Sequence, residues 1–331
     1  MTIDDDLPAL RVKCAGGAAA QTLALIDAIY VSLRTNRQFM LDYYPSGTGT
    51  YWPFEIEPLL KRHERPDSFS LSRGHTGSGT DQATGKVDPS HPINSKKLSV
   101  ETLYLLIRKF KLDRFLLGLR GEIPISTSKK QLDKVTRKTR SISGGYLPVQ
   151  SRNIFEELNE RFTQSGLPSP FDTSVNSEFS YEIVIHYRLG DKRAKYTNPE
   201  VVGDDGVIDP SIFAKQISDL GALNPRVLVL SDEPVLAQSL LNEVGISADI
   251  SPERNDIWTD LRLMANAKIF IGSWSQVSQL ASIFVLHNGG KAFLPSGISG
   301  SNSLKWTLEG LVKFEPKFLP ESHDIYFKKK P

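Results

Sequence analysis

The chain has 331 residues, enough for two domains, and its 39% hydrophobic and 24% charged residues are ordinary for a globular protein. Its 40 basic and 38 acidic residues give a formal net charge of +2, which argues against a dedicated nucleic-acid binder. A local basic site for a phosphate-bearing ligand remains compatible with this balance.

The first half opens with the pattern of a βαβ unit. Residues 10–14 predict a strand, 18–34 predict a helix with apolar side chains at helical spacing, and 38–43 predict a second, parallel strand. A stretch rich in Pro, Gly, Ser and Thr follows, and it fits either a long surface loop or an acceptor-side lid. Beyond it we predict helices over 99–117 and 151–162, a strand over 122–126, a basic helix face or loop over 129–140, and an interdomain linker over 164–176.

The second half alternates short apolar strands with helices of about ten residues, as in a doubly wound parallel sheet. The strands are predicted over 181–186, 226–230, 246–250, 268–272 and 291–294, and the helices over 210–220, 234–244, 257–267 and 275–284, with 291–294 as the last strand. The predicted fold class is therefore α/β. The predicted domains are residues 1–165, with a loop-rich insertion at about 44–98, and residues 177–315, followed by a tail at 316–331.

Cysteine and histidine content restricts the chemistry. The single cysteine, Cys14, excludes an intramolecular disulfide and a Cys-rich zinc site, and no two of the six histidines have ligand spacing within a helix. We therefore predict no bound metal. The acidic N-terminus lacks the apolar region of a signal peptide, and no stretch is apolar enough to span a membrane, so we predict a cytoplasmic protein. Oligomeric state has no signature in the sequence.

Polar clusters follow four of the predicted strands, at the ends where ligands bind in open parallel sheets. The clusters are His186 to Asp191, Ser231 to Pro234, Gly272 to Gln276, and the Gly16-Gly17 turn.

Arg188 is the first candidate for a phosphate contact, because its planar guanidinium offers paired donors and keeps its charge. Gly190 allows close backbone approach to a ligand, and Asp191 is placed to orient Arg188 or the ligand. A surface ion pair between Arg188 and Asp191 is the alternative. His186 fits equally a neutral core histidine and a group near the sugar or pyrophosphate.

The other clusters each have a structural and a ligand-binding interpretation. Ser231 and Asp232 are candidates to contact a ribose or base, or to cap the helix that begins near Pro234. Ser273, Ser275 and Gln276 open a helix whose N-terminal amides favour a phosphate, or they simply cap it. Asp260 lies in the first turn of its helix and also complements the helix dipole. Gly16 and Gly17 lack the complete dinucleotide and P-loop motifs.

Taken together, these residues resemble the fucosyltransferase superfamily of GT-B glycosyltransferases, which includes α1,2- and α1,6-fucosyltransferases and protein O-fucosyltransferases. The family's His-x-Arg-x-Gly-Asp motif is similar to the segment from His186 to Asp191. Further similarities are Gly16-Gly17 with Gln21, Gly145-Tyr146-Leu147, Ser231-Asp232-Glu233, and the series Asp260, Met264, Ala267, Ile271, Ser273 and Ser275. Leu189 occupies the position where the α1,2 and α1,6 branches typically carry a second arginine.

The resemblance implies two Rossmann-like domains facing a central cleft, and an inverting, metal-independent transfer from a GDP-sugar, with fucose as the expected sugar. It implies that Arg188 contacts the departing β-phosphate, and that Asp232 or Asp260 and the segment from Ser273 to Gln276 surround the nucleoside and pyrophosphate. The acceptor is expected to be a glycan or similar hydroxyl, deprotonated by Asp191, by His186 or by an acid within 44–140. Two alternatives stay open: transfer from another nucleotide-sugar, and nucleotide or glycan binding without turnover.

Overall fold

The computed structural model describes two compact groups of residues, and each group contains a sheet of its own. The first group comprises residues 9–14, 28–43, 60–64, 122–124, 139 and 141–143. The second comprises residues 16–27, 55–59, 151–174, 181–190, 192–193, 206–222, 224–251, 256–296, 310–320 and 322–327.

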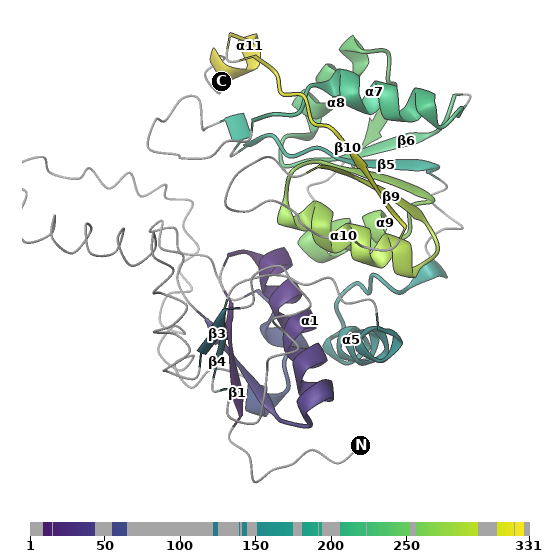
Figure 1. The fold of residues 1–331 in the computed structure, drawn as a ribbon. Coiled ribbons are helices and arrows are strands. Elements are labelled where there is room, and N and C mark those ends of the chain that lie inside the picture. The colour runs from purple at the N-terminus through teal and green to yellow at the C-terminus, as the bar shows by residue number, and fades with distance from the viewer. Residues whose placement is uncertain are drawn as a thin grey trace, which may run out of the picture. The chain divides into compact units, whose positions relative to one another are not determined.

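The first group contains a four-stranded parallel sheet (Figure 1). Its strands are β1 (Leu10–Cys14), β2 (Phe39–Tyr43), β3 (Glu122–Pro124) and β4 (Ser141–Ser143), in the order β2-β1-β4-β3. Helix α1 (Ala18–Thr35) connects β1 to β2, and Asn36, with a φ of 54°, ends it. The predicted βαβ unit is confirmed. Strand β4 was not predicted, because its three residues are too few to show an alternating pattern.

Cys14, the last residue of β1, is buried, with 3% of its surface exposed. Burial, with a smaller effect from the Asp42 carboxylate, raises the pKa of this thiol from 9.0 to about 12. At pH 8 the reactive thiolate is thus about a thousandfold scarcer than for an unperturbed thiol.

We expect iodoacetamide to leave Cys14 unmodified in the native protein at pH 8 and to alkylate it completely in urea. Mass spectrometry of the intact chain reads this directly, because Cys14 is the only cysteine. Complete native alkylation within minutes would contradict the burial of β1.

The second group contains a six-stranded sheet in which every strand pair is parallel. Its strands are β5 (Ile183–His186), β6 (Val227–Leu230), β7 (Ala248–Ile250), β8 (Ile269–Gly272), β9 (Lys291–Pro295) and β10 (Leu311–Phe314). The order β10-β9-β8-β5-β6-β7 places the first strand in the middle. The chain builds outward through β6 and β7, then returns to build the other side from β8. This reversal between β5 and β8 defines the doubly wound fold, and it confirms the predicted α/β class.

Helices cover both faces of this sheet: α7 (Pro210–Asp219) and α8 (Pro234–Glu243) lie on one face, and α9 (Ile257–Ala265) and α10 (Gln276–His287) lie on the other (Figure 1). Their starts follow local rules. Asp209 caps α7 ahead of Pro210, Asp256 caps α9 through the amides of Trp258 and Thr259, and Ser275 caps α10.

Strand β5 is buried on both faces, and its side chains alternate between them. Ile183, Ile185, Tyr187 and Leu189 belong to one apolar cluster with residues of α7 and α8. The Tyr187 ring packs edge-on against Phe213 of α7, with 4.9 Å between ring centroids, and its hydroxyl donates to the Ile208 carbonyl. His186 points to the opposite face, where it contacts Ser278 of α10. The odd-numbered side chains therefore pack on the face covered by α7 and α8, and His186 lies on the face covered by α10.

Helix α5 (Arg152–Ser165) extends three residues beyond its predicted end and stops at Gly166, which has a φ of 70°. The segment predicted as a linker then packs closely against its surroundings. Phe171 contacts Phe284 of α10 edge-on, and the side chain of Asn288 donates to the Pro170 carbonyl.

The residues after β9 form more structure than expected. The prediction that 291–294 is the last strand was wrong, because β10 pairs with β9 and completes the sheet edge. The chain then forms an antiparallel bridge between Phe318 and Ile208 and ends in a short helix, α11 (Asp324–Phe327). Leu319 and Ile325 are buried in the same apolar cluster as Leu189.

Several predictions lie wholly or mostly outside the described residues. These are the helix over 99–117, the basic stretch over 129–140 apart from Thr139, and the insertion apart from 55–64, which contains the turns η1 (Glu57–Leu59) and η2 (Arg62–Glu64). The domain boundaries and the central cleft stay predictions. Within the described part of the chain, no helix is both long and apolar enough to cross a lipid bilayer.

Candidate ligand site at the sheet reversal

Three strand ends lie level with one another at the carboxyl edge of the second sheet. In the register, His186 of β5 is opposite Leu230 of β6 and Gly272 of β8. The polar residues that follow these strands therefore meet at one place, as the sequence predicts. That place includes the reversal between β5 and β8, where open parallel sheets bind ligands.

Asp232 holds the segment after β5 from the side of β6. Its Oδ1 accepts from the Leu189 amide and its Oδ2 accepts from the Gly190 amide, both at 2.9 Å. The same Oδ2 is 3.5 Å from Nη1 of Arg188. One carboxylate therefore fixes the backbone of this segment and aligns its arginine.

Gly190 is required at its position by the close approach of Asp232. A Cβ atom on residue 190 would lie 2.5 Å from Oδ2 of Asp232, well inside van der Waals contact. The predicted role of this glycine was backbone approach to a ligand, and the structure shows that the backbone approaches a carboxylate of the chain itself.

Ser273 holds the same segment from the side of β8. Its hydroxyl accepts from the Arg188 amide at 2.9 Å, and its own amide donates to the His186 carbonyl at 3.0 Å. Ser273 is buried, with 2% of its surface exposed. These two bonds join β5 and β8 across the reversal point, so the backbone of Arg188 is fixed on both sides.

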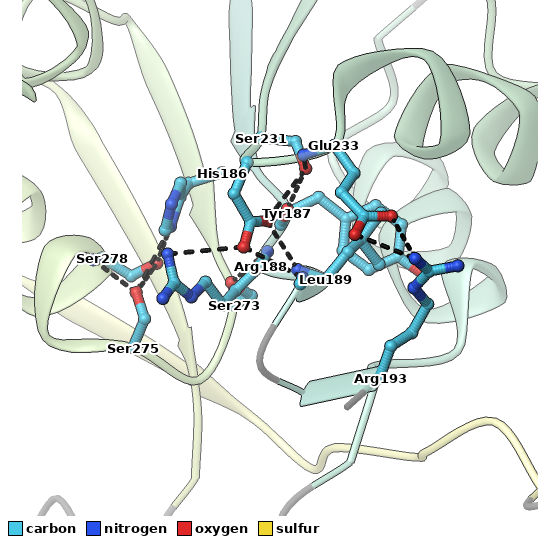
Figure 2. A network of polar contacts seen from close by, with 12 residues as sticks. His186, Tyr187, Arg188, Leu189, Arg193, Ser231, Glu233, Ser273, Ser275 and Ser278 are labelled. Carbon is cyan, nitrogen blue, oxygen red and sulfur yellow. Dashed lines mark hydrogen bonds and ion pairs between the residues drawn. The ribbon is translucent and has the colours of Figure 1, made fainter. Parts of the chain in front are cut away.

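His186 is buried beside the start of α10, as Figure 2 shows. Its Nδ1 is 2.7 Å from the Ser278 hydroxyl and 3.4 Å from the Ser275 hydroxyl. The imidazole is therefore a buried group satisfied by side chains. A role near a sugar or pyrophosphate stays a prediction.

Ser275 has the predicted capping role in α10: its side chain accepts from the Ser278 amide at 3.0 Å. The first amides of a helix have no intrahelical acceptor, so those of Gln276 and Val277 are suited to an anion, and a phosphate at this end of α10 stays a prediction. Gln276 itself is exposed at this end.

Capping of α8 by Ser231 or Asp232, one of the two interpretations of these residues, is not found. The N-cap is Glu233, and its side chain makes no capping hydrogen bond. The Ser231 hydroxyl donates instead to the Tyr187 carbonyl at 2.6 Å, and Asp232 is occupied by the amides after β5. Both residues thus stabilise the segment after β5, and the Ser231 hydroxyl also accepts from the Glu233 amide at 3.1 Å.

Of the remaining predicted site residues, Gly16 lies close to Gln276, since a Cβ atom on residue 16 would be 3.6 Å from Gln276 Oε1. Asp260 is in the first turn of α9, which Asp256 caps. Gly16 and Gly17 form the turn between β1 and α1, where Gly16 has a φ of 83° that favours glycine. Asp191 lies outside the described residues.

Two residues near this edge were missed in the sequence. Ser278 lies three positions after the capping Ser275, and its amide donates to the Ser275 hydroxyl. This spacing is typical of capping partners, so the sequence could have indicated Ser278. Arg193 lies five residues beyond Arg188 and pairs with Glu233. No local pattern indicates that pairing, because the two residues are distant in sequence.

A pocket of about 570 Å³ among the described residues is formed by other elements. It is lined by residues of α5, the following segment and α9, among them Asn159, Pro168 and Arg262. None of the residues at the sheet reversal lines it. No group of three or more His, Cys, Asp or Glu side chains in the described part of the chain is arranged to hold a metal ion.

No protein-family model and no curated protein matches this chain. Solved structures similar to it include the α-1,6-fucosyltransferase NodZ soaked with GDP-fucose, at 12% identity and a TM-score of 0.42, covering 84% of this chain and 93% of that one. The NodZ structure from Bradyrhizobium gives a TM-score of 0.41 at 12% identity, covering 83% and 92%.

POFUT1 is also similar. Its apo form covers 89% of this chain and 99% of that one, at 13% identity and a TM-score of 0.36. Its GDP complex covers only 50% of this chain and 57% of that one, at 16% identity and a TM-score of 0.27. The chain is thus similar to fucosyltransferase structures, as its motifs predict. Identities and TM-scores of this size assign neither a substrate nor a residue role to this chain.

Proposed function

We propose that this protein is a glycosyltransferase whose nucleotide-sugar donor binds at the reversal between β5 and β8. The observation that carries the proposal is the fixed position of Arg188. Its amide is bonded to Ser273, the next two amides are bonded to Asp232, and Asp232 is 3.5 Å from its guanidinium. A cation held in this way is preorganised for a phosphate.

The donor class follows from the chemistry of this edge. Arg188 and the amides at the start of α10 are donors suited to a diphosphate, and fixed donors of this kind stabilise a departing nucleoside diphosphate without a metal. The motif resemblance supports a GDP-sugar, with fucose as the first sugar to test. Asp260 is the proposed carboxylate near the nucleoside, because both oxygens of Asp232 accept backbone amides, and Gly16 and Gly17 are proposed for the donor or acceptor side.

In the proposed reaction, the acceptor oxygen forms a bond to the sugar carbon as the bond to the β-phosphate oxygen breaks. Arg188 and the first amides of α10 compensate the charge that develops on the leaving phosphate. The acceptor proton goes to a carboxylate or imidazole, for which Asp191 and His186 are the proposed candidates.

A panel of nucleoside diphosphates tests the proposal by thermal shift. We expect GDP to raise the melting temperature and UDP or ADP to have little effect. At a concentration 100 times its Kd, a ligand that binds only the native state adds about 2.7 kcal/mol to the free energy of unfolding.

Incubation with GDP-fucose and candidate glycan acceptors then separates a transferase from a protein that binds without turnover. Release of GDP with labelled glycan supports transfer, and binding without product supports a binding protein. If no nucleoside diphosphate shifts the melting temperature, the proposed donor site is wrong.

A further inference from the structure

Arg193 joins three separate segments of the second group, and Figure 2 shows its pairing with Glu233. Its Nη2 is 2.9 Å and 2.8 Å from the two carboxylate oxygens of Glu233, and its Nη1 donates to the Ile325 carbonyl at 3.2 Å. Its backbone amide donates to the Leu189 carbonyl at 2.7 Å. The segment after β5, the β6–α8 connection and the C-terminal segment therefore meet at one guanidinium.

The β6–α8 connection is fixed at both ends, with Asp232 between them. On one side the Ser231 hydroxyl donates to the Tyr187 carbonyl, and on the other Glu233 is held by Arg193. Asp232 presents its two oxygens to the amides of Leu189 and Gly190 from this fixed backbone. Any movement of Glu233 moves its neighbour Asp232, and with it the alignment of Arg188.

The positive charge of Arg193 has a second effect on the proposed phosphate site, because it compensates the charge of Glu233. The side chains of Arg193 and Glu233 are only 17% and 20% exposed, so their pairing is weakly screened by solvent. Without Arg193, the Glu233 carboxylate would be uncompensated beside a site that is proposed to bind a phosphate. Its repulsion would oppose the attraction of Arg188.

The C-terminal segment takes part through both polar and apolar contacts. Ile325 gives its carbonyl to Arg193, and its side chain is buried in the cluster that contains Leu189. Residues 322–327 are thus attached to the segment after β5 at two points, although more than 130 residues separate Leu189 from Ile325 in the sequence.

We propose that Arg193 is a positioning residue that sets how tightly the segment after β5 binds phosphate, and that it makes this affinity depend on residues 322–327. This inference rests on the proposed donor site. It goes beyond that proposal by adding a residue that touches no ligand and a distant segment that influences the site.

The first experiment needs no ligand. Hydrogen exchange measured by mass spectrometry is compared between wild type and Arg193→Met, which keeps the apolar stem of the side chain. We expect faster exchange in peptides that contain the Leu189 and Gly190 amides, with unchanged exchange in β6, which reports that the sheet remains folded. Unchanged exchange at Leu189 and Gly190 would overturn the positioning role.

The second experiment measures Kd for GDP and for guanosine by calorimetry. Arg193→Met should weaken GDP binding about tenfold and leave guanosine binding unchanged, because only the phosphate contacts depend on Arg193. Arg193→Lys and the double variant Arg193→Met with Glu233→Gln should both recover part of the loss, since lysine compensates the Glu233 carboxylate and glutamine removes its charge. An equal loss for GDP and guanosine, or no recovery in either rescue variant, would overturn the inference.

Two matched controls complete the design. Ile325→Ala should weaken GDP binding in the same sense as Arg193→Met. Leu319→Ala, in the same apolar cluster but not bound to Arg193, should not. Equal effects of the two alanine variants would show that the C-terminal segment contributes only through apolar packing, and would overturn its proposed influence on phosphate affinity through Arg193. If wild type binds no GDP, the proposed function fails, while the exchange experiment still decides whether Arg193 positions the segment.

Discussion

Replacing Arg188 with alanine should weaken GDP binding by about two orders of magnitude, which corresponds to about 2.7 kcal/mol. The expected loss has the size of one charge-assisted hydrogen bond to a phosphate, about 1.5–3 kcal/mol. Stability should change by less than about 1 kcal/mol, because the Arg188 side chain is 28% exposed and its ion pair with Asp232 spans 3.5 Å. Asp232 also keeps its two amide donors without Arg188.

Titration calorimetry and urea unfolding separate the two effects. Arg226→Ala is the matched control, because it removes the same charge near the opposite edge of the sheet, where Arg226 pairs with Asp249 at 3.8 Å. Arg188→Lys keeps the charge but loses the planar pair of donors, so its affinity should lie between wild type and alanine. An unchanged GDP affinity in Arg188→Ala would remove Arg188 from the proposed site.

Replacing Leu189 with arginine should destabilise the protein by about 3–5 kcal/mol, the usual cost of an unpaired charge in a packed core. Leu189 is fully buried in the cluster shared by β5, α7, α8 and the C-terminal segment. The α1,2 and α1,6 branches of the superfamily that the motifs resemble typically carry an arginine at this position. In this chain the position faces the core, so a second arginine there has no route to a ligand without disrupting the fold.

The measurement is the urea midpoint of unfolding, with Leu189→Met as the control. Methionine conserves the volume and polarity of the site and should cost less than about 1.5 kcal/mol. A wild-type midpoint for Leu189→Arg would show that position 189 opens to solvent and would contradict its assignment to the core.

Sequence patterns predicted the second sheet well because its strands are buried on both faces and its helices have local start signals. Strands β5, β6 and β8 read as continuous apolar runs, and Ser275 capped α10 as expected. The errors fall where the information is not local. Strand β10 follows a long stretch without a pattern, and its four residues are defined by pairing with β9. Strand β4 is likewise short and defined by its pairing.

The candidate site was predictable in composition but not in its internal bonds. Strand ends in a parallel sheet meet at one edge, so the clusters after β5, β6 and β8 had to converge. Which donor each carboxylate accepts is a long-range property, and it makes Asp232, for which a ribose contact or helix capping was expected, the acceptor for Leu189 and Gly190. Arg193 and Ile325 are joined for the same reason, and no short window of sequence contains both.

The alternation along β5 has a consequence for how this protein can change over evolutionary time. Odd-numbered positions from Ile183 to Leu189 are committed to the core, while the even-numbered His186 and Arg188 serve the proposed site. Variation at Arg188, whose side chain is 28% exposed, can therefore explore new ligands at little cost in folding free energy, whereas the even-numbered Val184 and His186 are buried and constrained by packing. A single-residue insertion or deletion in β5 would move the odd-numbered side chains to the opposite face of the sheet. It would thereby disrupt both the packing of the core and the proposed site. Randomised libraries that vary only position 188 should accordingly retain a high fraction of folded variants.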